Sequence, residues 1–137
     1  MEEKWLKWNP ADIPQGNYSV TGFVQDENGT VITLEDDKNS VKINFDGVVP
    51  FASTSLEGIR VRTWSEAQEK YQDRFFFRNW FLYRIENSKL GKWAEEESCG
   101  FYTATELCHY CIVTGEEVID ILAGFEPKLS WMSKGKE

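Results

Sequence analysis

The sequence predicts an α+β fold, built mainly as an antiparallel β-sheet or partly open barrel of about seven strands with two short helices. Segments that alternate large apolar with polar residues recur along the chain, which is typical of half-buried strands. Turn signals such as Asn28-Gly29 and Thr114-Gly115 separate some of these segments. Helical signals are confined to two short stretches. Short strands joined by tight turns favour antiparallel pairing, with the helices covering one side.

Length and composition set the scale of the fold. The chain has 137 residues and a mass of 15.9 kDa, which fits one domain over residues 1–137 with loose ends at about 1–4 and 132–137. Hydrophobic residues make up 41% of the chain and aromatic residues 15%. This apolar material can offset the entropy of ordering the chain, so wholesale disorder is excluded.

The first third of the chain predicts a β-meander. Tyr18–Gln25 alternates large apolar with small or polar residues, and the Asn28-Gly29 turn follows it. Thr30–Leu34 and Val41–Phe45 are the next two predicted strands. Glu35–Ser40 between them is polar, as expected for a solvated loop.

The middle of the chain mixes strand and helix signals. Val48–Thr54 is consistent with an extended segment that Pro50 confines to an edge or a bulge. Ile59–Trp64 alternates, with its apolar residues on one face and two arginines on the other, and predicts a half-exposed strand. Ser65 is then a candidate N-cap for a short helix over Glu66–Tyr71.

An aromatic and basic segment, Asp73–Arg84, admits two interpretations. Aromatic rings and arginines are what a single-stranded nucleic acid surface uses. The three consecutive phenylalanines Phe75–Phe77 are explained more simply by a strand buried on both faces. The chain is also acidic, so we expect no nucleic acid partner. Trp80–Glu86 is predicted to be a strand.

The last third predicts a helix followed by a hairpin. Lys89–Glu97 has helical spacing, with Trp93 expected to face the core and the helix ending near Cys99-Gly100. The hairpin joins Leu107–Val113 to Val118–Leu122. A two-residue turn sets Ile112 opposite Ile119 and Tyr110 opposite Ile121.

The only histidine, His109, falls on one face of this predicted hairpin together with Cys111 and Asp120. The register places Asp120 beside Cys111 and diagonal to His109, within reach of a hydrogen bond to the imidazole. One interpretation is a catalytic Cys-His-Asp or His-Asp group, in which the carboxylate fixes the tautomer. The other, which we favour, is a buried polar pair that satisfies itself and fixes the strand register.

The three cysteines, Cys99, Cys108 and Cys111, predict neither a disulfide framework nor a metal site. Alternating strand residues point to opposite faces, so the sulfurs of Cys108 and Cys111 diverge. We therefore expect no metal and no cofactor. The chain start lacks the features of a secretory signal, and its apolar runs are far shorter than the roughly 20 residues that span a bilayer. We expect a cytoplasmic protein with no membrane contact.

Acidic residues outnumber basic ones by 23 to 15, giving a formal net charge of -8. They gather in short clusters, mostly at predicted turns, where charge ordinarily maintains solubility. If several clusters share one face, they form a negative surface that steers a basic partner. The candidate binding residues are Glu35, Asp36, Asp37, Glu95, Glu96 and Glu97.

From Phe45 onward the chain resembles a family of small uncharacterised bacterial proteins. The residues that carry the resemblance are Phe45-Asp46-Gly47-Val48, Trp80–Tyr83, Glu86-Asn87-Ser88 with Trp93, His109-Tyr110-x-Ile112 and Val118–Ile121 ahead of Glu126-Pro127. Such small acidic proteins are similar in size and composition to immunity proteins encoded beside polymorphic toxins. The resemblance implies a fold and transfers no demonstrated activity.

Three functional hypotheses follow. The first is a non-catalytic protein-binding module, an immunity-like antagonist that covers a basic partner by charge complementarity with aromatic anchors. The alternative is a small-molecule-binding protein or enzyme whose pocket is lined by Tyr83, Trp93, His109, Tyr110 and Asp120. The third is a homodimer formed through an exposed sheet edge.

Overall fold

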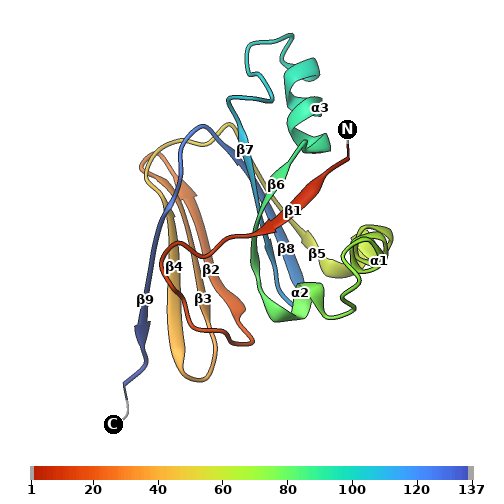
Figure 1. Ribbon diagram of the computed structural model, residues 1–137. Coiled ribbons are helices and arrows are strands. Elements are labelled where there is room, and N and C mark those ends of the chain that lie inside the picture. The colour runs from red at the N-terminus through yellow and green to blue at the C-terminus, as the bar shows by residue number, and fades with distance from the viewer. Residues whose placement is uncertain (1, 136–137) are drawn as a thin grey trace.

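The computed structural model describes residues 2–135 and confirms an α+β fold of antiparallel strands. Within residues 2–135, nine strands form two sheets that pack face to face and do not close into a barrel (Figure 1). The five-stranded sheet has the order β1-β6-β7-β8-β5 and the four-stranded sheet the order β2-β3-β4-β9. The strands are β1 (Lys4–Lys7), β2 (Ser19–Asp26), β3 (Gly29–Glu35), β4 (Asn39–Phe45), β5 (Phe51–Leu56), β6 (Leu82–Glu86), β7 (Cys108–Val113), β8 (Glu117–Ala123) and β9 (Lys128–Ser133).

The helices lie on the face of the five-stranded sheet that is turned away from the four-stranded sheet (Figure 1). They are a 3-10 turn η1 (Glu57–Arg60), α1 (Val61–Lys70), α2 (Phe76–Asn79) and α3 (Lys89–Glu97). The central strands β7 and β8 are therefore covered on both sides and buried along almost their whole length. Among residues 2–135, no helix combines the length and hydrophobicity that a membrane span requires.

The N-terminal meander β2-β3-β4 is as predicted. Its inner face is apolar because alternate residues of β3 and β4 point toward the five-stranded sheet. Ile32, Leu34, Val41 and Ile43 on these strands are fully buried, and Ile32 pairs with Ile43 across the strands. The strand that completes this sheet, β9, was not predicted, and it comes from the far end of the chain.

The β7-β8 hairpin has the predicted register. Ile112 lies opposite Ile119, and Tyr110 lies opposite Ile121. Tyr110 faces the four-stranded sheet, where its ring meets Phe45 edge-on at a centroid distance of 5.5 Å. The intervening residues of β7 therefore face the helices.

The segment Ile59–Trp64 is not a strand, so that prediction is wrong. Its apolar alternation does not mark a buried face, because Ile59 and Val61 are 75% and 64% exposed. Val61 instead begins α1, which runs to Lys70 and so starts earlier than the predicted helix over Glu66–Tyr71. Trp64 and Ala67, three positions apart, form its buried side.

Three further predictions need correction. Phe75–Phe77 do not lie in a strand: Phe76 begins α2, and β6 starts at Leu82 rather than Trp80. Trp93 does not face the core, because it is 45% exposed and its ring packs against Phe51 on the edge strand β5. The expected loose ends are partly paired, since Lys4 belongs to β1, and Met132 and Ser133 to β9. Residues 136–137 lie outside the described part of the chain.

Candidate functional site

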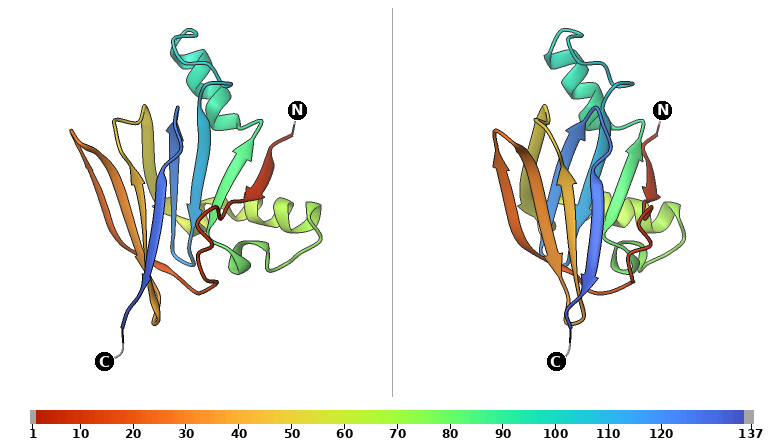
Figure 2. Two further views of the ribbon diagram at one scale, coloured as in Figure 1. Left: turned by 60° about the vertical axis from the view of Figure 1, so that its left-hand side comes forward. Right: turned by 90° about the vertical axis from the view of Figure 1, so that its left-hand side faces the viewer.

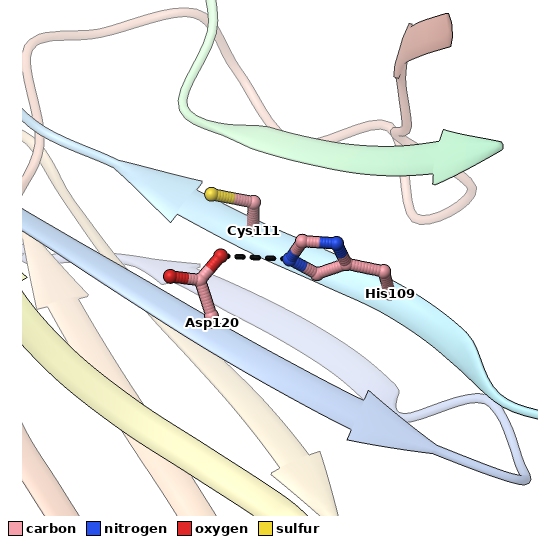
Figure 3. Close-up of side chains that lie close together, drawn as sticks. All are labelled: His109, Cys111 and Asp120. Carbon is pink, nitrogen blue, oxygen red and sulfur yellow. Dashed lines mark hydrogen bonds and ion pairs between the residues drawn. The ribbon is translucent and has the colours of Figure 1, made fainter. Parts of the chain in front are cut away.

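His109 and Asp120 form a buried hydrogen-bonded pair on the helix side of the five-stranded sheet (Figure 3). Asp120 lies directly opposite Cys111, which places it diagonal to His109. The imidazole Nε2 is 2.7 Å from the carboxylate Oδ1. His109 is 4% exposed and Asp120 1% exposed, so both polar groups depend on protein partners rather than on water.

Two residues that the sequence analysis did not single out complete this group. Arg60, at the end of η1, donates from Nη1 to Asp120 Oδ1 at 3.3 Å and forms a second, shorter ion pair from Nη2 to Oδ2. Ser88 lies with its Oγ 2.7 Å from His109 Nδ1. We call Ser88, His109, Asp120 and Arg60 the buried relay.

The local sequence explains how these two residues arrive at the site. Ser88 is the N-cap of α3, and its Oγ accepts a hydrogen bond from the backbone N–H of Gly91 at 3.0 Å. In the sequence Ser88 directly precedes the predicted helix Lys89–Glu97, but nothing in the sequence shows its contact with a distant histidine. Arg60 was hidden because the strand interpretation placed it on a solvent-facing surface.

The hydrogen bonds of the relay have a consistent direction. Because Ser88 Oγ accepts from Gly91, its own O–H is available to donate to His109 Nδ1. This assigns the imidazole proton to Nε2, from which it is donated to Asp120. Arg60 supplies the remaining donors to the carboxylate. The relay thus joins the first turn of α3 to β7, β8 and η1.

The charges within the relay favour an ionised Asp120. Burial alone raises the pKa of this carboxyl, but the hydrogen bonds from His109 and Arg60 and the charge of Arg60 outweigh burial and hold the pKa below its ordinary value. Burial raises the pKa of the neighbouring Cys111 thiol, and the charge of Asp120 raises it further. Cys111 is therefore a neutral, buried thiol.

His109, Cys111 and Asp120 also have ligand atoms within 4.8 Å of one another, which raises the question of a metal ion. The surroundings fit the relay better. The carboxylate of Asp120 already forms an ion pair with Arg60, whose positive charge would repel a metal cation bound there.

One end of the relay reaches a surface pocket. Ser88 and His109 line a pocket of about 640 Å³ beneath α3, with Trp8, Arg84 and Leu107 among its other walls. The aromatic residues expected to line such a pocket lie elsewhere. Tyr83 and Tyr110 are fully buried, and the Tyr83 hydroxyl donates toward the carbonyl oxygens of Phe76 and Trp80. Trp93 packs against Phe51.

The two acidic clusters lie at opposite ends of the molecule. Glu35, Asp36 and Asp37 fall at the β3-β4 turn, near the end of β9, and Glu95, Glu96 and Glu97 at the far end of α3 (Figure 1, Figure 2). They do not form one face. The first cluster also has structural partners: Asp36 Oδ1 accepts the backbone N–H groups of Lys38 and Asn39, and Glu35 pairs with Lys134.

Exposed aromatic residues flank the second cluster along the chain. Trp93 on α3 is 45% exposed, and Phe101 on the following loop is 78% exposed. The loop is tied back to the helix because Glu95 Oε1 accepts the backbone N–H of Ala104 at 2.6 Å. We call the surface made by Trp93, Glu95, Glu96, Glu97 and Phe101 the α3 end.

Comparison with known protein families, curated proteins and solved structures finds no match to this chain.

Proposed function

We propose that this protein is a non-catalytic protein-binding module, an immunity-like antagonist that uses the α3 end to contact a basic partner. The observation that carries the proposal is the exposure of Trp93 and Phe101 within an acidic segment. Aromatic side chains dominate the binding energy of protein interfaces, and surrounding charge sets association rate and partner choice. The resemblance to small bacterial proteins similar to immunity proteins agrees with this role.

The buried relay has a positioning role in this proposal. It fastens Ser88, the first residue of the α3 cap, through His109 to the centre of the sheet. A surface held in one orientation loses less entropy when it binds, because fewer conformations are restricted at the moment of contact. The relay thus contributes to binding without touching the partner.

The cluster at the β3-β4 turn is not part of the proposed contact. It lies at the other end of the molecule from α3 (Figure 2), and Asp36 is committed to shaping the turn. Glu35 therefore offers a matched control, because its change to glutamine removes the same charge from an acidic cluster outside the proposed interface.

The test uses affinity capture from the native host, followed by measurement with the purified partner. We expect a basic protein to be recovered, and its capture to weaken as salt rises. Phe101→Ala should weaken binding about tenfold or more, and Glu96→Gln with Glu97→Gln should slow association. Glu35→Gln should leave both unchanged. If Glu35→Gln reduced binding as much as the variants at the α3 end, or if Phe101→Ala did not reduce binding, the α3 end would be excluded as the binding surface.

A second candidate is a small-molecule-binding protein or enzyme, favoured by the opening of the relay into the pocket beneath α3. Ser88, His109 and Asp120 have the residue types and the order of a nucleophile, a base and an orienting carboxylate. A fluorophosphonate probe tests this directly. Enzyme chemistry requires labelling at Ser88 that is lost in Ser88→Ala and kept in Ser98→Ala, which changes a serine at the opposite end of α3. A folded protein without labelled Ser88 would rule out the nucleophile.

A further inference from the structure

The two sheets end in four edge strands, and β5 is the edge with the least protection against pairing with another strand. Exposed edges are usually blunted by shortness, charge, proline or a bulge. Strand β1 has only four residues and carries Lys4 and Lys7. Strand β2 has a register shift at Val20/Gly22 and ends at Asp26. Strand β9 begins with Lys128.

Strand β5 has none of these features. Its sequence, Phe-Ala-Ser-Thr-Ser-Leu, contains no charged residue and no proline. Its register with β8 is continuous from Phe51 to Leu56. Leu56 at its end is 73% exposed, and Ile59 and Val61 just beyond it are 75% and 64% exposed. An uncharged, regular edge beside exposed apolar side chains is typical of a pairing surface.

The backbone of β5 shows which groups face outward. The N–H of Glu57 donates to the carbonyl of Glu116 at 2.9 Å, one step beyond the pairing of Leu56 with Glu117. Hydrogen-bonded pairs alternate along an antiparallel ladder, so Ser55 and Ser53 also bond toward β8. The N–H and C=O groups of the intervening residues, Ala52, Thr54 and Leu56, therefore point to the open edge.

We propose that two copies of this chain pair through β5, antiparallel, with Thr54 on a two-fold axis. In this register Thr54 lies opposite its own copy, and Ala52 lies opposite Leu56. All three carry the outward-facing backbone groups, so every facing pair can exchange hydrogen bonds. The small alanine faces the large, exposed leucine, which allows both side chains to pack.

The absence of charge on β5 is the reason for choosing a second copy of the chain as the partner. A two-fold axis pairs the strand with an identical copy, so charges close to the axis meet like charges. The chain has a net charge of -8, yet β5 is free of charge and so avoids this repulsion. The same pairing at β1 would set its lysines near their copies.

Multi-angle light scattering of the purified full chain tests the proposal. We expect a mass twice the 15.9 kDa of one chain. Thr54→Lys should give a monomer with unchanged circular dichroism, because two lysines would meet at the axis. Val24→Lys is the matched control, since Val24 is a 57% exposed residue on the edge strand β2, and it should stay dimeric. A monomeric wild type, or equal dissociation by Val24→Lys, would overturn the proposal.

A cross-link tests the register itself. Facing residues of a hydrogen-bonded antiparallel pair have Cα atoms about 5.5 Å apart, within the range that a disulfide spans. In a Cys99→Ser background, which removes the exposed native thiol, oxidised Thr54→Cys should give a disulfide-linked dimer. Val24→Cys in the same background should not. Failure of Thr54→Cys to cross-link while Val24→Cys does would place the interface elsewhere.

Discussion

Replacing Asp120 with asparagine tests whether the buried relay holds the helices to the sheet. Asparagine keeps the shape of the side chain and an oxygen that can accept from His109 Nε2. It loses the charge that pairs with Arg60, and it turns an amide group toward the guanidinium donors. The substitution therefore isolates the ionic part of the relay from its packing.

The expected loss follows from the burial of the two partners. Asp120 is 1% exposed, so its charge is not screened by water. The Arg60 side chain is 29% exposed and can recover part of its hydration when the carboxylate is gone. Breaking a buried ion pair costs about 3 to 5 kcal/mol, and the partial exposure of Arg60 favours the lower limit. We expect a loss of about 3 kcal/mol and a decrease of about 10 °C in Tm.

Chemical denaturation with a double-mutant cycle measures this effect. We expect a coupling free energy of about 2 kcal/mol between Asp120→Asn and Arg60→Met, because each single change leaves a charged or polar group without its partner. Asp46→Asn is the control, since its carboxylate is 69% exposed and lies 3.8 Å from Lys128. It should change stability by less than about 0.5 kcal/mol. A loss below about 1 kcal/mol for Asp120→Asn would refute the anchoring role of the relay.

Three further outcomes are expected. Because the pKa of Asp120 is lowered in the folded protein, its carboxylate stabilises the fold at pH values above 3.8, the ordinary pKa of this group. This contribution is lost as pH falls through the lower folded-state pKa. In denaturation curves, the stability difference between wild type and Asp120→Asn should therefore shrink below about pH 4. Cys99 follows Ser98, the C-cap of α3, and has a φ of 53°, a backbone conformation that favours glycine; Cys99→Gly should therefore raise the free energy of unfolding by about 1 kcal/mol, while Ser98→Gly should not. Cys111 is fully buried and its thiol pKa is raised. In the native protein a thiol reagent should therefore modify the exposed Cys99 and reach Cys111 only after denaturant is added, as peptide mapping would detect. Modification of Cys111 in the native protein would contradict its burial.

The hairpin of β7 and β8 was the most predictable part of the molecule. Its turn and its apolar pattern specify one register, because a slip by one residue would move every buried side chain to the opposite face. That register alone placed Asp120 diagonal to His109, and the observed pair follows it. Local patterns also located α3, which was predicted over Lys89–Glu97 with its end near Cys99-Gly100.

The elements that were predicted wrongly or missed share one physical cause. Ile59–Trp64 alternates as a strand does, but alternation reports a strand only where one face is buried, and Ile59 is 75% exposed. Strand β1 is short and has polar ends, so its pairing with β6 depends on a partner about 80 residues away in sequence. Strand β9 likewise depends on β4. These elements gain stability from contacts that no local window contains.

The sequence by itself determined the fold class, the central hairpin and the His109–Asp120 pair, because each depends on residues close together along the chain. Tertiary structure decided which groups complete that pair, since Arg60 and Ser88 lie 60 and 21 residues from their hydrogen-bond partners. It also separated the two acidic clusters and left the edge of β5 open. Side-chain chemistry is local, whereas proximity and exposure depend on how the whole chain packs.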